Sequence, residues 1–184
     1  MLHDPLCNAH GWMSHVFVHE AAHAVAAIDR SIEFSHIEVL TPAQWTQDHP
    51  DGAAVGGLHL APPPSLWVLP DPVKALEMVL AGFLAEEGVY QHHISEGYRG
   101  DLRIWRLGAG LANGQTKTSI EEVLGCSMAD LLASTRTWLV EAFPRIRRVA
   151  VALAGADENS VLAVIDYGTG PWSMTYDEVR ALIS

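Results

Sequence analysis

The sequence predicts a mainly α-helical fold (α+β) with a small β-sheet, folded as one domain over 1–184. Three observations predict it: apolar residues recur mostly at helical spacing, only two short segments alternate like strands, and no linker or repeat divides the chain. Hydrophobic residues make up 49% of the 184 residues, which is enough to form one buried core.

The first expected elements are a helix and a small sheet. Apolar residues recur at helical spacing over about 14–30, and Ser14 is expected to be the N-cap that accepts a free backbone N–H. Residues 32–40 then alternate apolar and polar, and a second short strand is expected at 55–60. We therefore expect a small sheet at about 32–60, with a long loop between its two strands.

A second long helix is expected at about 71–91. Prolines at 62–64 end the sheet segment, because proline has no N–H to donate to a strand ladder. Asp71 and Pro72 then mark a helix start, since the acid can cap the helix and a proline in the first turn loses no hydrogen bond. The apolar residues that follow indicate a mostly buried helix.

The rest of the chain is expected to be helical, apart from one undecided segment. Gly97 and Gly100 are expected to interrupt it, with a helix from about 101–111 and the C-terminal helices at about 119–184. Residues 161–165 fit a strand or a helix equally well. Three signals mark helix starts: Ser119 with Glu122, Pro144, and Thr175 with Glu178.

The composition excludes several classes of partner. Asp and Glu number 22 against 11 Lys and Arg, and the net charge of −11 disfavours nucleic acid and anionic membrane surfaces. The two cysteines, Cys7 and Cys126, form no Cys-x-x-Cys pair, which points to a reducing compartment. No signal peptide is evident, and no apolar run approaches the ~18 residues of a membrane span. We expect a cytoplasmic protein with no membrane insertion and no nucleic-acid partner.

Residues 19–23 read His-Glu-Ala-Ala-His, a His-Glu-x-x-His motif inside the first predicted helix. Positions four apart lie about 40° apart around a helix, so His19 and His23 can bind one ion. Glu20 lies about 60° from His23 around the axis, and its carboxylate reaches the same side. A zinc ion in such a site keeps an open position for a water, whose proton Glu20 can accept. The motif therefore predicts metal-assisted hydrolysis of amides.

The motif leaves the third metal ligand open. His15 lies one turn before His19, but three positions over two helical turns rarely converge on one small ion. The adjacent pair His92 and His93 is more typical of a helix end that faces solvent. The acidic alternatives are Glu86, Glu87 and Asp101.

Three segments carry a resemblance to a known family. Residues 17–25 read Phe-Val-His-Glu-Ala-Ala-His-Ala-Val, residues 80–87 read Leu-Ala-Gly-Phe-Leu-Ala-Glu-Glu, and residues 97–102 read Gly-Tyr-Arg-Gly-Asp-Leu. In this order they resemble the protease domain of FtsH-type zinc metalloproteases, which are membrane-tethered and ATP-dependent. The two predicted strands and the terminal segment 176–183 also resemble that domain, so the resemblance covers nearly the whole chain.

The resemblance implies a zincin-like His-Glu-x-x-His helix in a single FtsH-type peptidase domain. It implies His19, His23 and Asp101 as Zn²⁺ ligands, with the third ligand in the segment 97–102. It also implies Glu20 as the catalytic general base. The second predicted strand is implied to hold an extended substrate by strand addition, although it has the alternative role of covering the core.

Two features of the resemblance stay open. Glu86 and Glu87 have two equally good interpretations: they support a ligand imidazole through its second N–H, or they face solvent at a helix end. The chain also departs from the family, with Ala22 in place of Gly, Phe83 in place of Arg, and a long loop at 41–54.

These observations predict a zinc-dependent metallopeptidase that hydrolyses unfolded polypeptides or peptides through a Glu-activated, zinc-bound water. The sequence contains no Gly-x-x-x-x-Gly-Lys-Ser/Thr phosphate loop, so we expect the isolated chain to act without ATP. The candidate protein partners are a separate ATPase and further copies of the chain in a homo-oligomer. One alternative is a catalytically weak zinc-binding regulatory or adaptor module derived from an FtsH-type protease. Another is a helical interaction domain without metal. The presence of Glu20 favours catalysis, because a structural zinc site does not need it.

Overall fold

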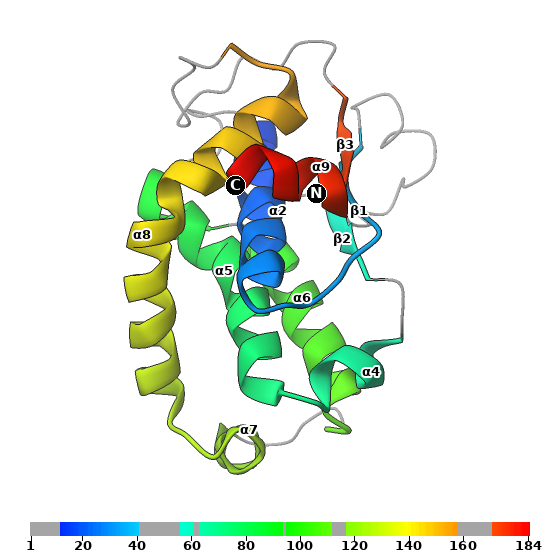
Figure 1. The fold of residues 1–184 in the computed structure, drawn as a ribbon. Coiled ribbons are helices and arrows are strands. Elements are labelled where there is room, and N and C mark those ends of the chain that lie inside the picture. Colours follow the sequence, from blue (N-terminus) through cyan, green and yellow to red (C-terminus); the bar gives the residue numbers. More distant parts are fainter. Residues whose placement is uncertain (1–11, 41–55, 61–62, 94, 112–116, 158–170) are drawn as a thin grey trace.

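A long helix, α2 (Trp12–Asp29), runs through the centre of the molecule (Figure 1). The computed structural model describes residues 12–40, 56–60, 63–93, 95–111, 117–157 and 171–184. The other helices are α4 (Pro64–Val68), α5 (Pro72–Tyr90), α6 (Ser95–Gly108), α7 (Lys117–Leu124), α8 (Met128–Ala154) and α9 (Tyr176–Ile183). The strands are β1 (His36–Val39), β2 (Gly56–His59) and β3 (Ser173–Thr175). The predicted mainly helical fold with a small sheet is confirmed.

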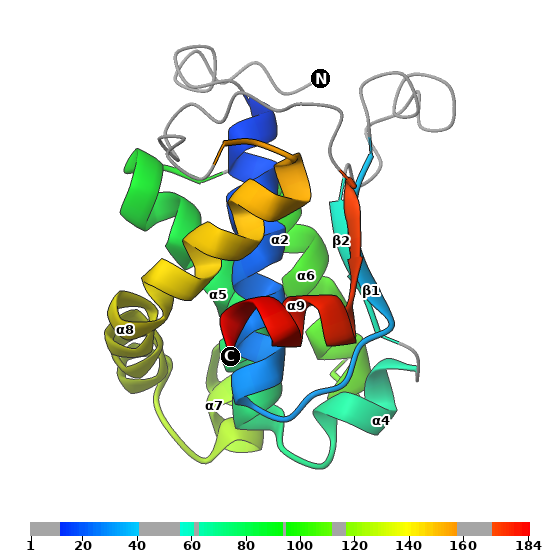
Figure 2. The ribbon, with the colours of Figure 1, turned by 45° about the horizontal axis from the view of Figure 1, so that its top comes forward.

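Other elements cover α2 on all sides, which explains its apolar sequence. Residues 13–27 are all buried, with α5 and α8 on one side and the sheet on the other (Figure 2). The expected N-cap at Ser14 is wrong, because the helix already includes Trp12 and Ser14 is only 2% exposed inside it. The buried Met13 continues the apolar pattern toward the N-terminus, so packing extends the helix past the serine.

The sheet consists of three antiparallel strands in the order β2–β1–β3. The predicted pairing of the first two strands is confirmed, with His36 opposite His59 and Val39 opposite Gly56. Ile37 and Val39 are buried, so one face of β1 packs on the core. The sequence does not predict β3, because three residues are too few to show a strand's alternation. The predicted loop between β1 and β2 lies outside the described residues.

Helix α5 begins where the sequence predicts. The Asp71 carboxylate accepts a hydrogen bond from the backbone N–H of Lys74 at 3.0 Å, and Pro72 occupies the first turn. The short helix α4 is not predicted. It begins at Pro64, the third of the consecutive prolines, because proline suits the first turn of a helix as well as the end of a strand.

Helix α6 corrects the prediction that two glycines interrupt this part of the chain. The helix runs continuously through Gly97 and Gly100. Each glycine costs a helix about 1 kcal/mol, and tertiary packing offsets this cost. Trp105 is completely buried, and its indole N–H donates to the Pro72 carbonyl at 3.0 Å. This anchor fixes α6 against α5 and thereby sets the position of Asp101.

In the C-terminal part, one predicted helix start is confirmed and two are wrong. Thr175 and Glu178 form the predicted capping box at the start of α9. Helix α7 begins two residues before Ser119, and α8 continues through Pro144 instead of beginning there. Helix α8 bends along its length (Figure 1), and a proline inside a helix is a common cause of bending. The undecided segment at 161–165 lies outside the described residues.

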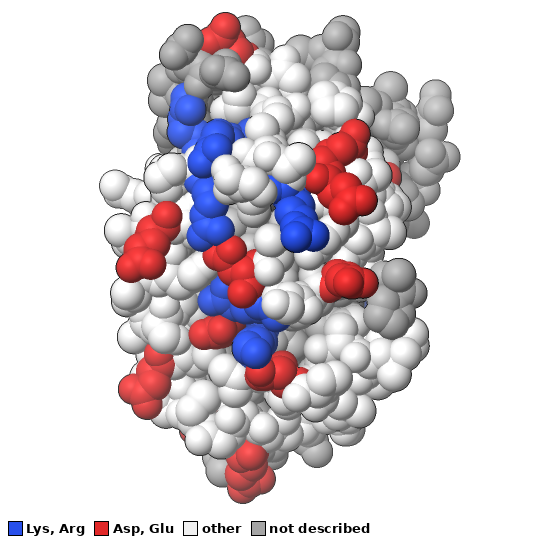
Figure 3. Space-filling view, in the orientation of Figure 1, with Lys and Arg blue, Asp and Glu red and all other residues white. Residues whose placement is uncertain are grey.

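The face formed by α8 and α9 carries charges of both signs. Lys and Arg side chains lie in a narrow band on this face, with Asp and Glu side chains beside them (Figure 3). This face therefore presents no broad basic surface. Among the helices of the described residues, none combines the length and the apolar character needed to span a membrane.

Candidate metal centre

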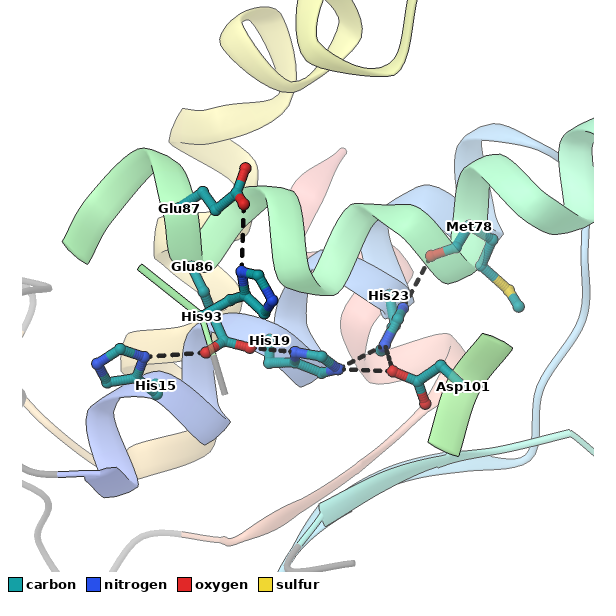
Figure 4. Close-up of polar contacts among 8 residues, drawn as sticks. All are labelled: His15, His19, His23, Met78, Glu86, Glu87, His93 and Asp101. Carbon is teal, nitrogen blue, oxygen red and sulfur yellow. Dashed lines mark hydrogen bonds and ion pairs between the residues drawn. The ribbon is translucent and has the colours of Figure 1, made fainter. Parts of the chain in front are cut away.

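Two helices bring His19, His23 and Asp101 together. The histidines lie one turn apart on α2, and α6 places Asp101 beside them (Figure 4). The Nε2 atoms of the two imidazoles are 2.9 Å apart. The Asp101 Oδ2 atom lies 2.9 Å from Nε2 of His19 and 3.2 Å from Nε2 of His23. These three atoms form a group that could hold a metal ion.

The dimensions and chemistry of this triangle fit a transition-metal ion. Ligand atoms around a tetrahedral zinc ion at roughly 2.0–2.1 Å lie about 3.3 Å apart, close to the 2.9–3.2 Å spacings seen here. Two imidazole nitrogens this close can share a hydrogen bond only if one of them is protonated. A bound cation would satisfy both nitrogens and the carboxylate at once.

Gly82 on α5 leaves the space in which the imidazoles meet. A Cβ atom at this position would lie 2.7 Å from Nε2 of His19 and 2.7 Å from Nε2 of His23. Real Cβ contacts are essentially never that short, so any side chain here would displace the ligand nitrogens. In the sequence, Gly82 is visible only as part of the family-like segment 80–87, and its packing role could not be recognised from it.

The second nitrogen of each imidazole is held by α5. The Nδ1 atom of His23 donates to the Met78 carbonyl at 2.8 Å, and Nδ1 of His19 is 2.5 Å from Glu86 Oε1. Such contacts fix the tautomer and orient Nε2 toward the other ligands. The backbone carbonyl of Met78 has no sequence signature, so only the structure identifies its contribution.

The structure separates the two adjacent glutamates. Glu86 is 1% exposed, and its carboxylate joins two imidazoles, with Oε1 near His19 and Oε2 2.9 Å from Nδ1 of His15 (Figure 4). Glu87 is part-exposed instead, and it contacts His93 at 3.1 Å and Arg136 at 3.4 Å. The supporting interpretation therefore applies to Glu86 and the surface interpretation to Glu87.

The other histidines considered as third ligands lie away from the group. His15 is completely buried and stacks on Tyr90, with ring centroids 3.8 Å apart. The Nδ1 atom of His92 contacts the Tyr90 carbonyl, and that of His93 contacts Glu87. None of these three imidazoles belongs to the group of converging ligand atoms around His19.

Without metal, the group carries a strongly held proton. Burial lowers the pKa of His19, but the contacts with Asp101 and Glu86 outweigh this effect and raise the pKa well above its usual value. Burial raises the pKa of Asp101, but His23 and His19 outweigh it and hold the pKa well below the usual range. Any metal ion held by His19 would therefore have to displace this proton.

Glu20 lies in the same buried environment, with one free carboxylate oxygen. The residue is 6% exposed, and among the described residues Oε2 has no hydrogen-bond partner. Burial raises its pKa to about 7, although His19 and His23 act in the opposite direction. Strand β2 passes directly over it, because a Cβ at Gly56 would lie 2.9 Å from Glu20 Cγ. The carboxyl group is thus set to exchange a proton near neutral pH.

The chemistry of the site has to be inferred from this geometry. No protein-family model matches the chain, and no curated protein matches it in sequence. The structure itself shows two buried histidines and one partly exposed aspartate that could hold a metal ion, with the buried Glu20 next to His19 in sequence.

Proposed function

We propose that the protein is a zinc-dependent metallopeptidase of the FtsH type. The observation that carries this proposal is the convergence of His19, His23 and Asp101, with Glu20 buried on the same helix. Two imidazoles and one carboxylate with an open fourth position are typical of catalytic zinc sites. Zinc bound there would supply Lewis-acid chemistry, polarising a carbonyl and lowering the pKa of water.

In this proposal Glu20 is the general base. Burial raises the pKa of Glu20 to about 7 in the metal-free site, and the positive charge of a bound zinc ion would lower it again, which favours the ionised carboxylate that accepts a proton. A structural metal site would have no use for an acid with an unpartnered oxygen, because burying such a group costs free energy. Glu20 would therefore accept the proton of the attacking water and pass it to the leaving amine.

Strand β2 is the proposed binding surface for the substrate. It lies at the edge of the sheet in the order β2–β1–β3, and its first residue, Gly56, contacts the Glu20 side chain. An extended peptide that added to this edge would run past the metal centre. Unfolded polypeptides and peptides are the substrates that can adopt such a conformation.

The test combines metal analysis with cleavage of peptides and of unfolded proteins. We expect one zinc ion per chain at the centre formed by His19, His23 and Asp101, and we expect Glu20→Gln to keep this zinc while activity falls about 10²–10⁴-fold. Glu141→Gln, which changes an exposed glutamate on α8, is the matched control and should leave both readouts unchanged. Equal activity in Glu20→Gln and the wild type would contradict the assigned role.

One observation favours the alternative of a catalytically weak zinc-binding regulatory or adaptor module. His19, Glu20 and His23 are each no more than 6% exposed, so a substrate could reach them only if neighbouring segments moved. Stoichiometric zinc without cleavage of any unfolded substrate would support this module over the peptidase. A chain that cannot be loaded with zinc would exclude both.

A further inference from the structure

We propose that His36, Glu38 and His59 form a second metal site on the outer face of the sheet, for a divalent transition-metal ion such as Zn²⁺. Each offers one ligand atom, and these atoms all lie within 4.8 Å of one another. The site shares no residue with the centre on α2, and it stands whether or not the protein is a peptidase.

The strand register brings the three side chains together. His36 and His59 are direct partners across β1 and β2, and Glu38 lies two residues after His36 on the same face. The two imidazole rings are stacked, with centroids 4.2 Å apart and an angle of 5° between their planes. The His59 Nε2 atom is 2.7 Å from Glu38 Oε1. Because nitrogen lone pairs lie in the plane of the ring, one of these parallel imidazoles must turn about its side-chain bonds for both nitrogens to reach the same ion.

Ser35 prepares His36 for metal binding. Its hydroxyl donates to the His59 carbonyl at 3.0 Å and lies 2.9 Å from Nδ1 of His36. Because the hydroxyl proton is used in the first bond, the serine oxygen accepts from Nδ1–H of the imidazole. The same tautomer leaves Nε2 of His36 unprotonated, and a second hydrogen bond of this kind is a regular feature of metal-binding histidines.

Gly57 explains why Glu38 reaches His59. Glu38 and Gly57 are direct partners in the register, so the position opposite the carboxylate has no side chain. The nearest atom to a Cβ built at Gly57 would be Nε2 of His59, at 3.7 Å. The histidine therefore leans over the glycine toward the acid.

The donor set and the surroundings both favour a transition-metal ion. Imidazole ligands suit zinc, copper and nickel, whereas magnesium and calcium prefer oxygen ligands alone. The side chains of His59 and Glu38 are 45% and 36% exposed, so an ion can enter from solvent and keep water as its other ligands. The net charge of −11 raises the local concentration of cations. An ion bound to these three residues would link β1 to β2, the strand whose Gly56 packs against Glu20.

The test compares zinc binding to the metal-stripped protein with binding to two variants. At saturating zinc we expect His59→Gln to bind roughly one zinc ion fewer per chain than the wild type. We expect Glu38→Gln to bind that zinc ion with lower affinity. His59 is exposed and Glu38 is partly exposed on the outer face of the sheet, so neither change should unfold the protein. His93→Gln, which replaces a part-exposed histidine outside the group, is the matched control and should bind as the wild type does.

A second readout locates the ion. Paramagnetic Cu²⁺ added to the zinc-equilibrated protein should broaden the amide NMR signals of His36, Glu38 and His59 first, and His59→Gln should abolish this effect. Equal zinc binding in His59→Gln and the wild type, or broadening confined to other residues, would overturn the proposal. Broadening around His19 and His23 instead would mean that Cu²⁺ binds at the centre on α2 and not on the sheet, which would contradict the proposed outer site.

Discussion

At the scale of single residues, Gly82 is the position where a small change should have the largest effect on the metal centre. A methyl group there would lie 2.7 Å from both ligand nitrogens, which must then move apart. We predict that Gly82→Ala loses the zinc ion held by His19 and His23, and with it any peptidase activity. Metal analysis after dialysis measures this directly.

Gly88, six residues further along α5, is the control for this prediction. A Cβ at this position would make only one ordinary contact, 3.9 Å from Leu139 Cδ2. Gly88→Ala should keep the zinc and stabilise the protein by up to about 1 kcal/mol, because alanine favours the helix. Zinc retention in Gly82→Ala equal to that in Gly88→Ala would mean that the metal does not bind between these imidazoles.

His15 is expected to act on the metal centre indirectly. Its Nδ1 atom holds Glu86 Oε2, while Oε1 of the same carboxylate holds His19. We predict that His15→Phe weakens zinc affinity about 10–100-fold, because the ring still stacks on Tyr90 but no longer holds the carboxylate. A competitive chelator titration measures the affinity. Unchanged affinity would show that Glu86 is positioned without His15.

The sequence predicts the metal-binding and catalytic residues of the centre better than the α5 residues that position them. His19, Glu20 and His23 follow from spacing within one helix, which is a local property. Glu86 and Glu87 are adjacent and point about 100° apart around α5, so only the rotation of the packed helix decides which one is buried. The same rotation directs Gly82 at the imidazoles, and no pattern within the segment reveals it.

At the scale of elements, Asp29 ties the end of α2 to α8. Its carboxylate accepts two hydrogen bonds from Arg145, at 2.6 and 2.8 Å, and one from the Trp138 indole at 2.8 Å. Hydrogen bonds to a charged group contribute about 1.5–3 kcal/mol. We therefore predict that Asp29→Ala lowers the free energy of unfolding at pH 7 by about 2 kcal/mol, measured by urea denaturation.

The same contact should depend on pH in a defined direction. Burial raises the pKa of Asp29, but Arg145 and Trp138 outweigh this effect and lower it below the usual value of about 3.8. A group with a depressed pKa stabilises the fold above its unfolded-state pKa and loses this contribution as the pH falls through its folded-state pKa. The stability difference between wild type and Asp29→Ala should thus be full at pH 7 and shrink below about pH 4. A difference independent of pH would contradict the ionic contribution.

Cap residues, prolines and glycines predict some helix boundaries correctly and others wrongly, depending on whether tertiary packing continues past them. The caps at Asp71 and Thr175 mark real helix starts because their side chains bond the first turn. Ser14 and Pro144 lie inside helices, where burial against neighbouring elements outweighs the local preference to begin a helix. Tertiary packing similarly carries α6 through its glycines. Cap residues therefore predict a helix start only when no buried surface continues past them.

At the scale of the whole molecule, the candidate metal centre joins three helices from separate parts of the chain. The ligands lie on α2 and α6, while α5 supplies the supporting Glu86 and the space at Gly82. Their approach could not be predicted from periodicity, because it depends on how the helices pack around α2. The family resemblance supplied Asp101 as an expectation, and the structure places its carboxylate beside the two imidazoles.

If a metal ion binds this group, its binding is coupled to the docking of α6, which carries Asp101. A ligand that binds only the folded state stabilises it by about 2.7 kcal/mol when its concentration is 100 times the Kd. Of the three ligands only Asp101 lies on α6, so removing zinc should release this helix before others. We predict that chelation lowers the Tm and speeds amide hydrogen exchange in α6, while the middle of α8 keeps its protection. In Asp101→Asn, zinc should leave the exchange of α6 unchanged. If the wild-type α6 exchanges at the same rate with and without zinc, the ion does not join α6 to α2.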